Sequence, residues 1–222
     1  MKNRIDKEEI SLGLSLLKKN KIEINLPKNI RDELDDNILF RGHDLIFKKL
    51  IKKSKVYLEY GSGKSTLWTL KNTNTKVYSI ETDKEWYQKI LENTIKETKM
   101  IDIKLVDIGP VINWGRPINY NYYKNFNNYT DFYWKKNIQP DLVLIDGRFR
   151  VCSFLTSLKF AQEGTFILFD DYIERGVYHI VESFIKKYDQ NLEQALFKVP
   201  PKSEIDYERL EEMINNFRFV VD

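Results

Sequence analysis

Residues 55–66 constrain the fold of this chain more than any other segment. They read Lys-Val-Tyr-Leu-Glu-Tyr-Gly-Ser-Gly-Lys-Ser-Thr. The apolar run that ends in Glu59 predicts a buried strand, Gly61 and Gly63 predict a tight turn, and the Ser-Thr pair predicts a helix start. In α/β proteins such a junction binds nucleotide-like ligands, because glycines let the ligand approach and free backbone N–H groups point at it. The segment therefore predicts an α/β fold with a ligand site at this turn.

Two common nucleotide motifs fit this turn poorly. Residues 63–65 match the end of a phosphate-binding P-loop, but Leu58 stands where that motif needs its first glycine. The dinucleotide motif G-x-G-x-x-G fails at its third glycine, where the chain has Thr66. Glu59, two residues before Gly61, would repel a pyrophosphate and attract a cationic ligand. The turn therefore favours a cationic ligand over a phosphate group.

A second acidic residue, Glu81, ends the predicted strand at 76–81. It follows the glycine turn by roughly 20 residues, the spacing at which a βαβ unit places a carboxylate against a ribose diol. The alternative is that Glu81 caps the helix expected at 83–98, together with Thr82 and Asp83. Because Glu59 already points to a cationic ligand, we favour the ribose interpretation.

Four segments together resemble the class I S-adenosylmethionine-dependent methyltransferases, and they span residues 55 to about 175. They are residues 58–67, 77–87, 141–148 and 164–172. The resemblance implies S-adenosylmethionine as cofactor, with its methionine part at the glycine loop and its ribose at Glu81. Lys64 departs from the pattern, since a cation is unexpected beside a sulfonium. The cofactor residues that the resemblance implies are Glu59, Tyr60, Gly61, Ser62, Gly63, Ser65, Thr66, Glu81, Thr82, Asp107, Ile108, Asp146, Gly147 and Arg148.

Three carboxylates follow two further predicted strands. They belong to Asp146, Asp170 and Asp171. Oxygen ligands of this kind suit a divalent cation such as Mg²⁺, which would orient and acidify an acceptor hydroxyl, and some small-molecule O-methyltransferases resembling this pattern use such a metal. The alternative is that Asp170 caps the following helix and Asp146 pairs with Arg148 or Arg150. The two arginines could also bind an anionic group of the substrate.

The candidate catalytic residues are Asp146, Asp171 and His179. His179 is expected about two turns into the helix that follows the carboxylates, where it could act as a general base. The alternative is a histidine in the partial core, paired with Glu182 at position i+3.

The remaining pattern predicts a doubly wound, Rossmann-like sheet of about seven mostly parallel strands, with helices on both faces. If the family pattern holds, the last strand is antiparallel. We expect one domain, with a helical cap at 1–53 and an α/β core at 54–222. The expected helices are 7–19, 43–53, 83–98, 149–161, 174–187 and 205–214, and the further strands are 103–107, 141–146, 165–170, 194–199 and 217–221.

The aromatic segment at 108–140 interrupts this alternation. Loops of this length in a compact domain are usually functional or disordered, and the many aromatic residues argue against disorder. We interpret the segment as a lid or substrate wall beside the cofactor, and its Asn and aromatic side chains suit stacking on a sugar or a planar acceptor. The alternative is a passive cover over the sheet end. Its aromatic residues are Trp114, Tyr120, Tyr122, Tyr123, Phe126, Tyr129, Phe132, Tyr133 and Trp134.

Composition narrows the class of protein. The chain has 222 residues, 31% of them charged, with a net charge of only +3. This near-neutral balance disfavours a nucleic-acid substrate, which needs a basic surface. The single Cys152, the lack of a membrane-spanning run and the absence of a signal-peptide core predict a cytoplasmic protein. We expect a methyltransferase acting on a small-molecule or sugar-like acceptor, or alternatively a binding protein with the same fold and no catalysis.

Overall fold

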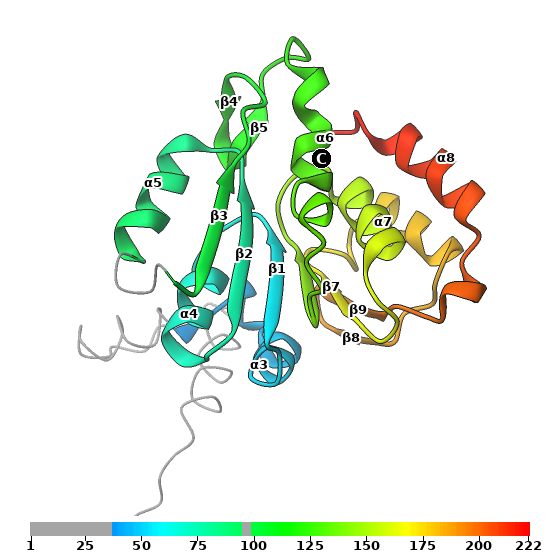
Figure 1. The fold of residues 1–222 in the computed structure, drawn as a ribbon, viewed down its shortest axis with the longest axis horizontal. Helices are drawn as coiled ribbons and strands as arrows, with labels where there is room; N and C mark the ends of the chain where they lie inside the picture. The colour runs from blue at the N-terminus through cyan, green and yellow to red at the C-terminus, as the bar shows by residue number, and fades with distance from the viewer. Residues whose placement is uncertain (1–36, 95–98) are drawn as a thin grey trace, which may run out of the picture.

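Seven strands form one sheet in the described part of the chain (Figure 1). In sheet order they are β3 (Ile101–Leu105), β2 (Lys76–Glu81), β1 (Val56–Tyr60), β6 (Leu142–Ile145), β7 (Phe166–Phe169), β9 (Gln194–Lys198) and β8 (Asp189–Asn191). The structure is a computed structural model that describes residues 37–94 and 99–222. From β3 to β7 all neighbours are parallel, whereas β9 is antiparallel to both of its neighbours. The predicted Rossmann-like sheet is confirmed, including an antiparallel last strand.

Helices cover both faces of this sheet (Figure 1). On one face α3 (Leu45–Ile51) and α4 (Lys64–Asn72) enclose a hydrophobic cluster with the strands. On the other face α6 (Phe126–Asp131), α7 (Arg150–Phe160) and α8 (Tyr207–Phe217) enclose a larger cluster. Helix α5 (Lys84–Asn93) packs against β2 and β3. This arrangement leaves the carboxyl ends of the parallel strands as the edge where loops meet.

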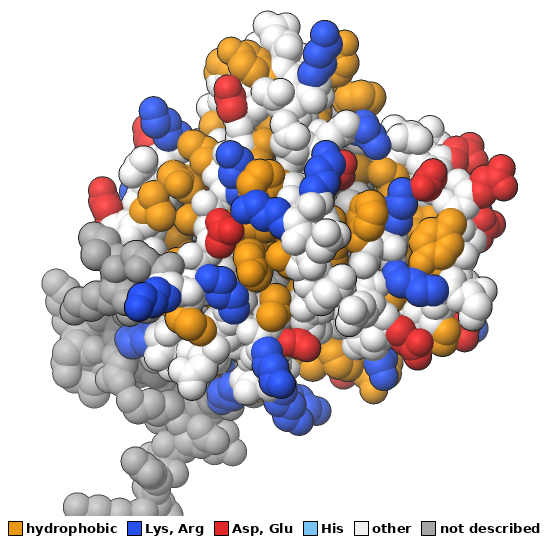
Figure 2. Space-filling view, in the orientation of Figure 1, with side chains coloured by type: hydrophobic (Ala, Val, Ile, Leu, Met, Phe, Trp, Pro, Cys, Tyr) orange, Lys and Arg blue, Asp and Glu red, His pale blue; other side chains and the backbone are white. Residues whose placement is uncertain are grey.

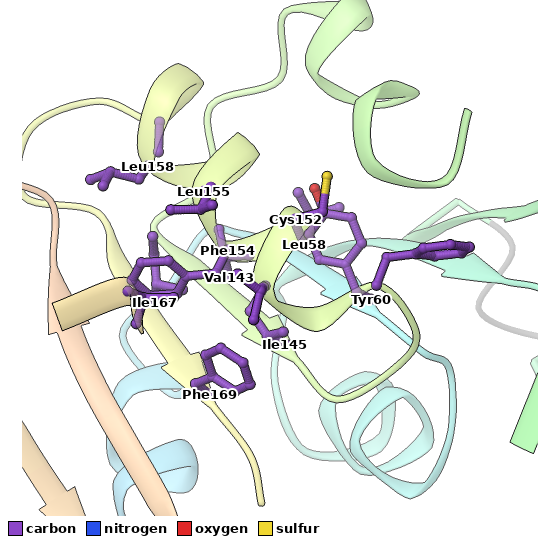
Figure 3. Close-up of a cluster of buried hydrophobic side chains, with 14 of the residues drawn as sticks. Leu58, Tyr60, Val143, Ile145, Cys152, Phe154, Leu155, Leu158, Ile167 and Phe169 are labelled. Carbon is purple, nitrogen blue, oxygen red and sulfur yellow. The ribbon is translucent and has the colours of Figure 1, made fainter. Parts of the chain in front are cut away.

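Strand β6 shows why both faces are covered. Successive side chains of a strand point to opposite faces, and every residue of β6 is apolar and buried. Leu142 and Leu144 join the cluster under α3 and α4, whereas Val143 and Ile145 face α7. Figure 3 shows the α7 side of this core, where Phe154 and its helix neighbours lie over strand residues.

Several predicted boundaries need correction near the end of the chain. The segment predicted as a helix at 174–187 is a 3-10 helix over Gly176–Ser183. Its buried residues Tyr178 and Val181 are three apart, the spacing that falls on one side of a 3-10 helix. The strand predicted at 217–221 is wrong, because α8 runs to Phe217 and residues 218–222 form no strand. The sheet ends instead with β8, whose Asp-Gln-Asn sequence carries no hydrophobic pattern.

The aromatic segment at 108–140 is more regular than predicted. It begins with a small antiparallel hairpin of β4 (Val111–Ile112) and β5 (Arg116–Pro117). Three short helical turns follow, and among them α6 is the helix that joins β3 to β6. Tyr129 and Tyr133 are part of the main core. The second half of the segment is therefore core structure, and only the hairpin and the turn after it remain candidates for a lid.

The other predicted elements agree with the structure or lie outside its described residues. Helix α3 falls within the predicted 43–53, and β3 begins two residues before the predicted 103. The predicted helix at 7–19 lies outside the described residues, as do residues 95–98 of the helix predicted at 83–98. None of the helices in the described ranges combines the length and the apolar composition that a membrane crossing requires.

Candidate cofactor and acceptor site

The candidate residues follow β1, β2, β6 and β7, whose carboxyl ends lie at one edge of the sheet. The Gly61–Gly63 turn follows β1, Glu81 ends β2, Asp146 follows β6 and Asp170 follows β7. In open α/β sheets ligands bind outside this edge. The topology therefore brings the predicted cofactor residues and the predicted carboxylates to the same side of the molecule.

Glu59 is a buried residue that supports the glycine turn and the start of α4. Its side chain has no exposed surface, and its carboxylate accepts hydrogen bonds from Tyr57 (2.9 Å), Ser65 (2.9 Å) and Thr66. Burial raises the pKa of Glu59 to about 7, because a charged carboxylate is poorly solvated there. In this structure the Glu59 carboxylate holds the first turn of α4 in place, and its predicted contact with a cofactor stays a prediction. Ser65 and Thr66 are turned inward with it.

Thr66 explains why the chain has no third glycine in this turn. The backbone N–H of Gly63 donates to the Thr66 hydroxyl at 2.9 Å, so the side chain caps the start of α4. The same hydroxyl donates to Glu59. A glycine at this position would lose both contacts, so Thr66 belongs to the support of the turn.

The turn after β1 and the turn after β6 lie against each other. Gly61 has a φ of +93°, and a Cβ there would lie 2.8 Å from the Cα of Gly147. A Cβ on Gly147 would overlap the hydroxyl of Tyr129, which also accepts a hydrogen bond from the N–H of Arg148 at 3.0 Å. Both glycines are required by this approach of the two turns.

Glu81 links β2 to the glycine turn. One carboxylate oxygen accepts from the N–H (3.1 Å) and the hydroxyl (2.7 Å) of Ser62, and the other from the N–H groups of Thr82 (2.7 Å) and Asp83 (3.0 Å). A carboxylate offers about four acceptor positions, so all of them are in use. The side chain is only 7% exposed, and burial raises the pKa of Glu81. The carboxylate lies beside the turn, as a ribose clamp requires, but the Ser62 hydroxyl occupies one of its oxygens.

The β4–β5 hairpin covers this corner. The Thr82 hydroxyl donates to the carbonyl of Gly115 at 2.9 Å, and a Cβ on Gly115 would overlap that hydroxyl. Beside it Trp114 is 86% exposed, with the unusual φ of +65°. Two further predicted cofactor residues follow β3. Asp107 is exposed, and its carboxylate accepts from the N–H of Gly109 at 2.9 Å, whereas Ile108 is buried in the core.

The three predicted carboxylates come together as expected. Oxygen atoms of Asp146, Asp170 and Asp171 lie within 4.8 Å of one another. Gln194 donates to Asp170 at 2.7 Å. Burial and the neighbouring Asp170 raise the pKa of Asp146 well above its usual value, and burial likewise raises the pKa of Asp170.

An arginine already occupies this cluster. The guanidinium of Arg150 lies 3.3 Å from the Asp146 carboxylate and 3.4 Å from that of Asp171, and it is 3% exposed. The sequence suggested that Asp146 pairs with Arg148 or Arg150, and the structure shows the pair with Arg150. The Arg148 guanidinium donates instead to the carbonyl of Asp222. The donor set is chemically suited to a divalent cation, but a buried guanidinium among the same oxygens does not fit one.

Comparison with solved structures places this geometry in a known fold. The structure is similar to a methyltransferase-like protein from Silicibacter pomeroyi, with 26% sequence identity, a TM-score of 0.66, and coverage of 86% of this chain and 96% of that one. The chain has the class I methyltransferase fold. No protein-family model matches the sequence, and no curated protein does.

Two further structures with this fold were crystallised with S-adenosylhomocysteine. An O-methyltransferase from Bacillus cereus has 14% identity, a TM-score of 0.42, and coverage of 97% of this chain and 81% of that one. An RNA methyltransferase from Salinibacter ruber has 12% identity, a TM-score of 0.43, and coverage of 81% and 95%. Their TM-scores fall below 0.5, so the likeness to the Silicibacter protein decides the assignment of the methyltransferase fold.

His179 is exposed on the 3-10 helix, and its ring lies 4.9 Å from that of Tyr172. Its role as a general base stays a prediction. Glu182, its expected partner, accepts instead from the Tyr172 hydroxyl at 2.9 Å and pairs with Lys187. Arg175 is the residue of this segment that reaches the carboxylates, at 2.8 Å from Asp171.

One residue important to the site was missed from the sequence, and the place of another was only partly predicted. Tyr129 was assigned to a loop, whereas it lies in α6 and seals the contact between the turns after β1 and β6. Arg150 was considered from the sequence as a partner of Asp146 or as a substrate-binding residue, and the structure shows the pairing with Asp146, with Arg150 buried at the start of α7.

Proposed function

We propose that the protein is an S-adenosylmethionine-dependent methyltransferase that methylates a hydroxyl group of a small-molecule or sugar-like acceptor. The observation that carries this proposal is the buried carboxylate of Glu81, which is hydrogen-bonded to Ser62 of the glycine turn. This turn follows β1, where the strand order of the methyltransferase fold reverses direction. A carboxylate at that place suits two ribose hydroxyls. S-adenosylmethionine would supply an electrophilic methyl group on a sulfonium.

The surface beside this edge supports the proposed acceptor class. Exposed apolar side chains gather on the hairpin, on the turn that follows it and on the last residues of the chain, and Figure 2 shows orange side chains at the top of the molecule where these elements lie. Asparagine side chains are interspersed with them. Aromatic faces stack on sugar rings or planar groups, and amides bind hydroxyls. The exposed apolar residues are Ile112, Trp114, Ile118, Tyr120, Tyr122, Tyr123, Phe219 and Val220.

The chain's own residues would remove the acceptor proton. Asp171 has a partly exposed carboxylate, and Asp146 lies beside it with a third of its side chain exposed. One of these carboxylates would take the proton of the acceptor hydroxyl, and the oxygen would attack the methyl carbon as the carbon–sulfur bond breaks. The products are a methyl ether and S-adenosylhomocysteine. Positioning would supply most of the acceleration.

The test is methyl transfer from labelled S-adenosylmethionine to a panel of sugars and phenols. We expect transfer to at least one hydroxyl acceptor, a large loss of kcat in Asp171→Asn, and a raised acceptor KM with normal stability in Trp114→Ala. His179→Ala tests the remaining base candidate. Transfer to no acceptor, or tight binding of ATP without binding of S-adenosylmethionine, would overturn the proposal.

A binding protein without catalysis is the second candidate. One observation favours it: arginines lie against Asp146 and Asp171, the proposed proton acceptors. This candidate predicts binding of S-adenosylhomocysteine without transfer to any acceptor. The same labelled assay therefore separates the two, provided that binding is measured in parallel.

A further inference from the structure

Arg150 lies among the three carboxylates at the place where a divalent cation would coordinate. Its guanidinium contacts Asp146 at 3.3 Å and Asp171 at 3.4 Å. We propose that Arg150 is the resident cation of this acidic cluster, so that the cluster works without a metal ion. The proposal concerns the site's own chemistry and holds whether or not the protein transfers methyl groups.

Backbone carbonyl groups fix Arg150 in this position. Its Nε donates to the carbonyl of Gly147 (3.0 Å), Nη1 to that of Asp170 (2.8 Å) and Nη2 to that of Asp146 (3.1 Å). The guanidinium therefore bridges the loop after β6 and the loop after β7. With 3% exposure it cannot turn to solvent without breaking these bonds, and a buried charge separated from its partners is strongly disfavoured.

Positive charge already surrounds the cluster. Besides Arg150, Arg175 contacts Asp171 at 2.8 Å, whereas Arg41 lies 3.8 Å from the same carboxylate and closer to Glu193, at 3.2 Å. A divalent ion would therefore enter a site in which two guanidinium groups already contact the carboxylates, and they would repel it. Gln194 also directs an N–H at one oxygen of Asp170, where a ligand oxygen would have to face the ion.

Arg150 holds the carboxylates together, as a bound metal ion would do. It draws the carboxylates of Asp146 and Asp171 to one point and joins two strand ends to the first turn of α7. If the protein is a methyltransferase as proposed, the acceptor proton would pass to a carboxylate without metal assistance. Arg150 is then a positioning residue for that carboxylate.

The test measures Mn²⁺ and Ca²⁺ binding directly on the full chain. The protein is treated with EDTA, dialysed, and titrated by calorimetry, with the electron paramagnetic resonance of free Mn²⁺ as a second readout. For the native protein we expect no saturable binding below roughly 1 mM, the weak end of protein calcium sites. We also expect EDTA to leave the melting temperature unchanged.

Two matched variants decide what Arg150 does. Arg150→Gln removes the cation and should strengthen Mn²⁺ binding by at least about tenfold, a typical change when the surroundings of a metal site are altered. The gain should vanish in the double variant Arg150→Gln, Asp171→Asn. Arg150→Lys keeps a positive charge and should bind no more metal than the native protein.

Two results would overturn the proposal. One is micromolar Mn²⁺ binding by the native protein that Asp171→Asn abolishes, and the other is a folded Arg150→Gln variant with no gain in metal binding. If Arg150→Gln does not fold, the native titration and Arg150→Lys decide by themselves. A parallel titration with S-adenosylhomocysteine keeps this test separate from that of the proposed function.

Discussion

The hydroxyl of Ser62 donates to the carboxylate of Glu81 at 2.7 Å, and the N–H of the same serine donates to the same oxygen. If Glu81 binds a ribose as proposed, the side chain of Ser62 occupies the position of one ribose hydroxyl. The indole N–H of Trp86 also donates to the carbonyl of Ser62, at 2.5 Å. These contacts hold the glycine turn in place, and under the proposal a bound cofactor would replace part of them.

Ser62→Ala is expected to bind S-adenosylhomocysteine at least as tightly as the native protein, because it frees one acceptor position on Glu81. It should cost about 1 kcal/mol of folding stability, the net value of one hydrogen bond. Calorimetry and urea denaturation measure the two quantities. A large loss of affinity in this variant would mean that the serine itself binds the cofactor or that it orients Glu81.

Gly147→Ala is expected to destabilise the fold by about 1–3 kcal/mol, the usual cost of overpacking. Its Cβ would overlap the Tyr129 hydroxyl and lie 2.8 Å from the N–H nitrogen of Gly61. Urea denaturation gives the free energy of unfolding. Gly176→Ala is the matched control, because a Cβ at that position would have no neighbouring atom within 4 Å and the change should be close to neutral. Equal stability of the two variants would contradict the close approach of the turns.

Glu59 is expected to make stability fall as the pH rises. Its pKa is raised from 4.5 to about 7 in the folded protein, so the folded state holds a proton that the unfolded state releases. The stabilisation from this proton is complete below about pH 4.5 and is lost as the pH rises through about 7, by at most about 3 kcal/mol. Urea denaturation between pH 5 and pH 8 measures this fall.

The isosteric variant Glu59→Gln isolates this effect, since it cannot ionise and keeps the side-chain shape. Its stability should depend less on pH than that of the native protein over the same range. Glu163→Gln, at an exposed position, is the control and should follow the native profile. If the profiles of native protein and Glu59→Gln run parallel, the carboxylate does not titrate as described.

Much of the fold was predictable because its signals are local. The apolar runs of β1 and β6, and the glycine turn after Glu59, are each written in a few adjacent residues. Strand β8 was not predictable in the same way, because an exposed edge strand needs no apolar face and Asp189–Asn191 has none. Helix α6 was hidden by the aromatic residues around it, which are poor indicators of a helix.

The candidate site was predictable in its residues but not in their partners. Glu81 and the three aspartates were found from their positions at strand ends, and the fold brings the aspartates together. Whether a metal ion or an arginine balances the charge of the three aspartates could not be predicted. The long side chain of Arg150 bridges two loops, and no sequence pattern fixes its direction. The burial of Glu59 likewise depends on hydroxyls from β1 and α4 that are brought together only by folding.

Under the proposed function, Glu81 and the glycine turn bind S-adenosylmethionine. The most direct measurement is calorimetric titration of S-adenosylhomocysteine, which cannot react, into the native protein and into Glu81→Ala. We expect saturable binding at micromolar concentration to the native protein and a loss of at least about tenfold in the variant, because charge-assisted hydrogen bonds contribute about 1.5–3 kcal/mol each. No binding to the native protein, or equal binding to a folded Glu81→Ala variant, would contradict it.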